Sequence, residues 1–96
     1  MTLDEFRATL RDARPPDVSP ALVALWHDAR GDWEASHDVA QNIDDATGSW
    51  VHGYLHRKEG DLGNASYWYQ RIGRPLAENS LEAERDALLS DLLVGR

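Results

Sequence analysis

Residues 49–73 do the most to limit what this chain can fold into. Apolar residues recur at helical spacing over 49–59 and again over 62–72, and the dipeptide Gly60-Asp61 separates the two segments. Glycine ends a helix readily because it adopts the left-handed backbone conformation, and aspartate caps the N-terminus of the helix that follows. The stretch therefore predicts an αα-hairpin, two antiparallel helices joined by a tight turn.

The remainder of the chain carries the same kind of helical signal. Thr2 with Glu5, and Asn79 with Glu82, match the capping-box pattern, while Ser19-Pro20 is typical of a helix start. No segment shows the alternation expected of a strand. The expected helices cover about residues 3–13, 20–30, 33–43, 49–59, 62–72 and 79–94.

These signals predict an all-α fold of about six helices. Two hairpins, over about 20–43 and 49–73, are flanked by N- and C-terminal helices at about 3–13 and 79–94. A chain of 96 residues is expected to form one domain, residues 1–96. Its apolar share of 42% and its four tryptophans favour a folded globule over disorder.

Charge and composition exclude several classes of partner. A net charge of −7 argues against binding to nucleic acid or to anionic membranes, which require basic patches. No apolar run approaches the length of a membrane span, and the charged N-terminus does not resemble a signal peptide. The chain has no cysteine, which excludes disulfides and thiolate zinc sites. We expect a cytoplasmic protein.

An internal repeat relates the two predicted hairpins. Residues 26–41 align with residues 55–70 at a constant offset, which places Gly31-Asp32 over Gly60-Asp61 and His27 over His56. On this alignment both hairpins resemble tetratricopeptide (TPR) repeats. The small residues of the TPR pattern correspond to Ala24, Gly53, Ser36 and Ala65.

Residues 50–73 also resemble a group of small bacterial and fungal proteins. The shared pattern is W-x-H-x3-H-R-x-E-x-D-x2-N-x2-Y-W-aromatic-x-R-x-G, and each fixed position is present here. This resemblance implies no particular activity.

His52 and His56 are the sharpest polar feature of the sequence. They lie four residues apart, so a helix places them on one face. The TPR resemblance implies that both positions face the second helix of the hairpin instead of water. Buried imidazoles need partners, because an unpaired buried polar group costs roughly 1–3 kcal/mol. The expected partners are His37, Glu59, Asp61, Asn64 and Tyr67.

The sequence supports three interpretations of this polar cluster. The first is a divalent metal site in which His52 and His56 are joined by His37, Glu59 or Asp61. The second is acid–base or hydrolytic catalysis by a half-buried histidine beside Glu59 or Asp61. No nucleophile motif accompanies the histidines, so the sequence leaves open whether the chain is an enzyme. The third is a polar network that holds no cofactor and fixes helix register.

A binding surface is the other functional feature that the sequence suggests. The TPR resemblance implies a concave groove lined by the first helix of each hairpin, with Trp50, Tyr54, Arg57 and Lys58 exposed in it. Aromatic residues beside cations are typical binding anchors. The leading expectation is therefore a small binding or adaptor module whose partner is a protein, a peptide or a small ligand. The apolar last helix also makes a homodimer conceivable.

Arg71 is a further cation near the predicted turn of the second hairpin. We expect it to pair with Glu59 or Asp61 across that turn, an interaction worth roughly 0–1 kcal/mol at a surface.

Overall fold

The computed structural model describes residues 1–93, and these residues form six α-helices without a strand. The all-α prediction is confirmed. The helices are α1 (Leu3–Ala8), α2 (Pro20–Ala29), α3 (Trp33–Ala40), α4 (Ala46–Glu59), α5 (Leu62–Gln70) and α6 (Leu81–Leu93), with a short 3-10 turn, Thr9–Arg11, after α1. Within this described part of the chain, none of the helices combines the length and hydropathy that crossing a bilayer requires.

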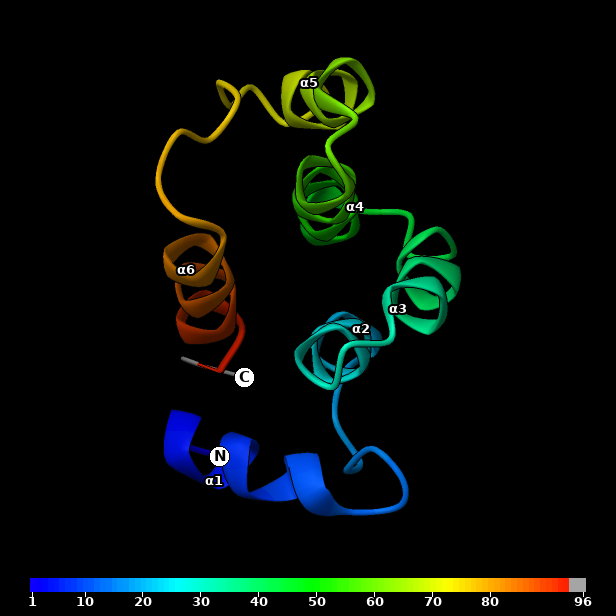
Figure 1. Cartoon of the computed structure of the whole chain (residues 1–96), viewed down its shortest axis with the longest axis vertical. Coiled ribbons are helices and arrows are strands. Elements are labelled where there is room, and N and C mark those ends of the chain that lie inside the picture. The colour runs from blue at the N-terminus through cyan, green and yellow to red at the C-terminus, as the bar shows by residue number, and fades with distance from the viewer. Residues whose placement is uncertain (94–96) are drawn as a thin grey trace.

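Helix α4 is the central element of the fold. It pairs with α5 as one hairpin, and α2 pairs with α3 as the other (Figure 1). Helix α4 also packs against α2, α3 and α6, while α1 packs against α6. The core between these helices includes Phe6, Leu22, Leu25, Trp26, Val51, Tyr54, Leu55, Leu88, Leu89 and Leu92.

Several of the predicted helix ends are confirmed. Thr2 and Glu5 form a capping box, with the Thr2 N–H donating to Glu5 Oε1 at 2.8 Å and the Glu5 N–H donating to Thr2 Oγ1 at 3.1 Å. Gly60 ends α4 with a φ of 91°, the left-handed conformation that its position requires. Asp61 then caps α5 by accepting a hydrogen bond from the Asn64 N–H at 3.2 Å.

The predicted start of α2, with Ser19 as the N-cap residue and Pro20 in the first turn, is confirmed in position, whereas the predicted cap of the last helix is wrong. The Ser19 side chain makes no capping hydrogen bond, and Pro20 at the first helical position reduces the need for one because it has no N–H. The last helix begins at Leu81, and its cap is Ser80, whose Oγ accepts from the Ala83 N–H at 3.0 Å. The expected Asn79–Glu82 capping box is therefore not formed, and Ser80 caps the helix from one residue further along the chain.

Some predicted helix boundaries are also wrong. Helix α4 begins at Ala46, three residues before the expected start at residue 49, because the Asp45 carboxylate accepts from the Gly48 N–H at 2.8 Å and caps it. Helices α1, α3 and α5 end two to five residues earlier than expected, since their last turns are completed by 3-10 or turn hydrogen bonds. Of the last predicted helix, position 94 lies outside the described residues.

Small residues lie where the helices of each hairpin approach one another. In the first hairpin the buried Ser36 hydroxyl donates to the Ala24 carbonyl oxygen at 2.6 Å. In the second, a Cβ added to Gly53 would lie 3.4 Å from the Ala65 carbonyl oxygen. Both hairpins thus use the equivalent pair of positions for close approach. The assignment to TPR repeats stays a prediction.

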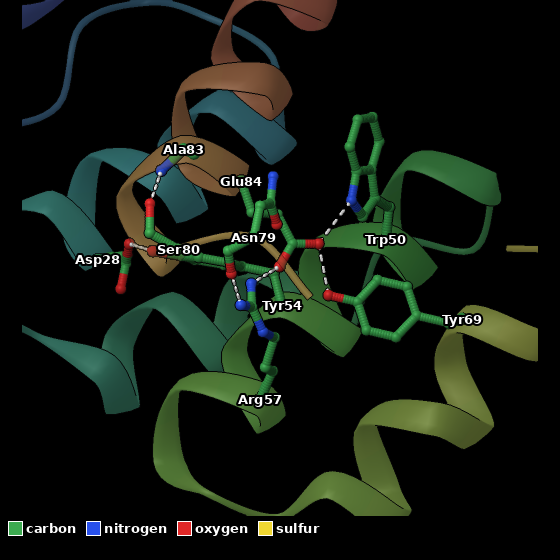
Figure 2. Close-up of polar contacts among 9 residues, drawn as sticks. All are labelled: Asp28, Trp50, Tyr54, Arg57, Tyr69, Asn79, Ser80, Ala83 and Glu84. Atoms are coloured by element: carbon green, nitrogen blue, oxygen red, sulfur yellow. Dashed lines mark hydrogen bonds and ion pairs between the residues drawn. The ribbon is translucent and has the colours of Figure 1, made fainter. Parts of the chain in front are cut away.

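A buried carboxylate on α6 ties that helix to the second hairpin (Figure 2). Glu84 Oε1 accepts from the Arg57 guanidinium at 2.7 Å, and Oε2 accepts from the Trp50 indole N–H at 3.1 Å and from the Tyr69 hydroxyl. Arg57 also donates to the Asn79 carbonyl oxygen. The charge of Glu84, which is 3% exposed, is thereby neutralised by a cation from α4.

A second buried carboxylate, Asp28 on α2, ties the first hairpin to α4. Its Oδ2 accepts from the Tyr54 hydroxyl at 2.6 Å (Figure 2), and its Oδ1 accepts from Lys58 Nζ at 2.7 Å. The Arg85 guanidinium lies 3.9 Å from Oδ2. Because a buried charge without partners is costly, these contacts fix the register of α4 against its neighbours. Helix α4 is the element that also carries His52 and His56.

Candidate metal centre

Three histidines from two helices converge beside α4. His52 and His56 lie one turn apart on α4 and are 6% and 7% exposed, and the half-buried His37 reaches them from α3. His37 Nε2 and His52 Nε2 are 2.9 Å apart. One ring nitrogen of each histidine lies within 4.8 Å of those of the other two. The structure thus brings together the three histidines that the sequence proposed as ligands.

Two tryptophans form walls on either side of this cluster. The Trp33 ring stacks on His37 with centroids 4.9 Å apart and planes 12° apart. The Trp68 ring stacks on His52 at 3.9 Å and 14°. Trp33 is anchored by its indole N–H, which donates to the Leu55 carbonyl oxygen at 2.8 Å. These indoles hold the imidazoles in fixed planes and shield one side of each from water.

Glu59 orients His56. His56 Nδ1 lies 2.6 Å from Glu59 Oε2, a distance typical of a strong hydrogen bond between an imidazole N–H and a carboxylate. A histidine that donates one N–H to a carboxylate keeps the lone pair of its other nitrogen free, which is how ligating histidines are commonly held in metal sites. Asp61 belongs to the same end of the cluster, because one of its oxygens lies within 4.8 Å of ligand atoms of His56 and Glu59.

The environment keeps His52 neutral. Burial, the largest cause, and the neighbouring positive charges of His37, His56 and Arg71 together lower the pKa of His52 to about 4. At the 2.9 Å contact with His37, one nitrogen donates and the other accepts, so the pair cannot bind a proton at both of these atoms. A neutral imidazole is the form that coordinates a metal ion.

Two of the expected partners do not reach the histidines. The Asn64 side-chain oxygen accepts from the Trp68 indole N–H at 3.1 Å, and Asn64 is exposed. Tyr67 is 54% exposed and meets the edge of Trp68 at 5.2 Å. Both residues lie on the outer side of α5, because that helix presents Trp68 to His52. The predicted membership of Asn64 and Tyr67 in the polar cluster is corrected accordingly.

The expected exposed groove of aromatic and basic residues is also not formed. Tyr54 is 1% exposed with its hydroxyl on Asp28, and Lys58 binds the same carboxylate. The Arg57 side chain is 12% exposed and pairs with Glu84. The polar ends of these side chains turn to two buried carboxylates on α2 and α6 that require partners, while the Lys58 side chain stays 33% exposed.

Trp50, another of the four predicted binding residues, borders a cleft. This cleft of about 510 Å³ lies between α4, α6 and the segment that joins α5 to α6. The Arg74 guanidinium stacks over the Trp50 ring, with its Cζ 3.8 Å from the ring centroid. Trp50 is thus one wall of a cleft that the Arg74 side chain partly covers.

No sequence pattern identifies some of the residues that build the site. Trp33 and Trp68 are apolar positions of amphipathic helices, and a stacking role cannot be distinguished from core packing in such a pattern. Glu84 reads as a solvated residue of the last helix, and only tertiary packing makes it a buried acceptor. The pairing of His37 with His52 follows from the packing of α3 against α4.

Comparisons of this chain with models of protein families, with curated proteins and with solved structures give no match. The functional argument therefore rests on the geometry of the site.

Proposed function

We propose that the chain binds a divalent transition-metal ion through His37, His52 and His56. The observation that carries this proposal is the convergence of three imidazole nitrogens within 4.8 Å of one another at a site walled by two indoles. Three neutral imidazoles are a common ligand set for zinc, and they also suit copper, nickel and cobalt.

The chemistry of the cluster supports an ion more than a hydrogen-bonded network. A network of three imidazoles satisfies one contact between His37 and His52 and one between His56 and Glu59, yet it also gathers a ring nitrogen of each histidine within 4.8 Å of the other two. Ligands of a tetrahedral ion with bonds of about 2.0–2.1 Å lie about 3.3 Å apart, so only small side-chain shifts separate the present arrangement from a coordinating one. The ion would replace the proton shared by His37 and His52.

The other properties of the chain are compatible with this proposal. The absence of cysteine leaves imidazole and carboxylate as the available ligands and fits the cytoplasmic location we infer. Three protein ligands leave a fourth coordination position for water or another ligand. A bound ion would therefore supply a site of the kind used for metal-assisted hydrolysis, with Glu59 holding His56 in place.

Isothermal titration of the metal-free, untagged protein with zinc tests the proposal, together with mass-spectrometric metal content after purification. We expect one ion per chain, and we expect binding to be lost in His52→Gln and weakened at least about tenfold in His37→Gln. The matched control is His27→Gln, because His27 occupies the repeat position equivalent to His56 but lies against Trp26, away from the cluster. Equal zinc binding by all three variants, with circular dichroism showing intact folds, would refute the site.

The cleft beside Trp50 supports a second proposal, a binding module for a peptide or small ligand. Its volume of about 510 Å³ is within the range of ligand pockets. Trp50, which belongs to the binding surface proposed on sequence grounds, lines this cleft. Nuclear magnetic resonance screening of a peptide and fragment library would test it. Binding should shift the Trp50 indole N–H signal, and a library whose hits all leave that signal unchanged would argue against a ligand site there.

A further inference from the structure

Arg71 lies next to Trp68, the indole that stacks on His52. It follows the last residue of α5, and its guanidinium Cζ is 5.0 Å from the centroid of the Trp68 ring that stacks on His52. The expected pairing of Arg71 with Glu59 or Asp61 does not form. Helices α4 and α5 run antiparallel, so the C-terminus of α5 lies at the opposite end of the hairpin from the turn at Gly60.

The charge of Arg71 is not neutralised by an ion pair. Among residues 1–93, the arginines in ion pairs are Arg7, Arg57 and Arg85, and Arg71 is not one of them. Its neighbours are the faces of Trp68 and Tyr67, which attract a cation but leave the N–H donors of the guanidinium available. In a chain with a net charge of −7, a cation without a carboxylate partner, next to the indole that stacks on His52, favours an anionic ligand at this place.

We propose that the metal centre takes a small oxyanion, a carboxylate or a phosphoryl group, with one oxygen on the ion and another on Arg71. This inference rests on the proposed function, because the ion supplies the first contact. The ion on three neutral histidines keeps its double positive charge and an open position, and an anion fills that position more favourably than water does. The planar guanidinium supplies two N–H donors in the geometry that two oxygens of one group require.

The structure gives this oxyanion a place to approach. A cleft of about 310 Å³ is lined by Arg71, Ile72 and Ser49, and Ser49 is on α4 one turn before His52. Asp44 and Asp45 also line this cleft. The Asp45 carboxylate is engaged in capping α4, where it accepts from the Gly48 N–H at 2.8 Å.

Cobalt(II) absorption tests the inference because the visible bands of cobalt respond to a change in its fourth ligand. The protein is loaded with cobalt and titrated with methylphosphonate, acetate or chloride, and the same titrations are run on Arg71→Gln. The matched control is Arg74→Gln, which changes the net charge equally at an arginine that stacks on Trp50 in the other cleft. We expect Arg71→Gln to bind methylphosphonate or acetate about tenfold or more weakly, and Arg74→Gln to bind them as the wild type does.

The titrations separate the possible outcomes. Chloride is a single atom and cannot contact the ion and Arg71 through two oxygens, so its affinity should be nearly the same in both variants. A response to methylphosphonate alone supports a phosphoryl ligand, and a response to acetate alone supports a carboxylate. Bands that appear with cobalt but stay unchanged with both oxyanions, or that respond equally in Arg71→Gln and Arg74→Gln, overturn the role of Arg71 and leave the metal site standing. Failure of cobalt to give bands at all overturns the metal site itself.

Discussion

Replacement of Glu84 by alanine should destabilise the fold more than any other single change on α6. The substitution removes a carboxylate that is 3% exposed and leaves Arg57 as a buried cation without its partner. Breaking a buried ion pair in this way typically costs about 3–5 kcal/mol. The Trp50 indole N–H and the Tyr69 hydroxyl also lose their acceptor, at about 1 kcal/mol or more each where water cannot replace it.

The cleft beside Trp50 lets water reach part of this network, so these costs do not simply add. We expect the free energy of unfolding to fall by about 4 kcal/mol, a large share of the about 5–15 kcal/mol typical of a domain. Glu84→Gln keeps an acceptor oxygen and should cost about half as much. Urea unfolding followed by far-ultraviolet circular dichroism measures both variants against Glu82→Ala, an exposed residue of the same helix that should change stability by less than about 0.5 kcal/mol. A loss in Glu84→Ala within about 1 kcal/mol of that control would refute the network argument.

Three further perturbations probe other parts of the structure. Gly48→Ala should lower the free energy of unfolding by about 1–3 kcal/mol, because the added Cβ would lie 2.3 Å from the Ile43 carbonyl oxygen. Gly63→Ala, whose added Cβ would meet nothing within 4 Å, should be neutral or stabilising. Equal urea midpoints for the two variants would contradict this. The metal-free protein should lose stability as the pH falls from 6.5 to about 4. In the folded chain the pKa of His52 is lowered to about 4, chiefly by burial, so between these pH values the unfolded chain binds a proton at His52 that the folded chain does not. A pH profile of unfolding that is the same in His52→Gln as in the wild type would argue against this. Burial raises the pKa of Tyr54 and Tyr69, as do their hydrogen bonds to Asp28 and Glu84, so the free energy of unfolding should fall as the pH rises above 10.0. Tyrosinate absorbance is the measurement, with Tyr69→Phe used to assign the signal of Tyr69. Ionisation of Tyr69 in the folded protein near pH 10.0 would contradict this expectation.

Local signals in the sequence were sufficient to predict the helical class and many helix ends. The Thr2–Glu5 capping box, the left-handed Gly60 and the Asp61 cap each depend on neighbouring residues only, so their outcome did not require knowledge of the tertiary fold. The start of α4 was missed because residues 44–48 have the composition of a turn. There Gly48 is needed where the chain passes close to Ile43, and Asp45 acts as a cap.

The candidate site was predicted only in part, because a sequence pattern shows local spacing and does not show how distant helices pack. The spacing of His52 and His56 fixed their common face, but the contact with His37 depends on how α3 packs against α4. The groove prediction failed because it treated Tyr54 and Arg57 as free side chains. Tyr54 and Arg57 donate hydrogen bonds to the buried carboxylates of Asp28 and Glu84, which are distant in the sequence. No local pattern shows that an acidic residue will be buried.

The direct test of the metal site is a crystal structure of the protein grown with zinc, with anomalous data collected on both sides of the zinc absorption edge. The site predicts one strong anomalous peak bonded to nitrogens of His37, His52 and His56 at about 2.0–2.1 Å, with Glu59 still on His56. The direct contact between His37 Nε2 and His52 Nε2 should then be replaced by two bonds to the ion. An intact contact of 2.9 Å between these nitrogens, with no anomalous peak beside them, would contradict the proposed function.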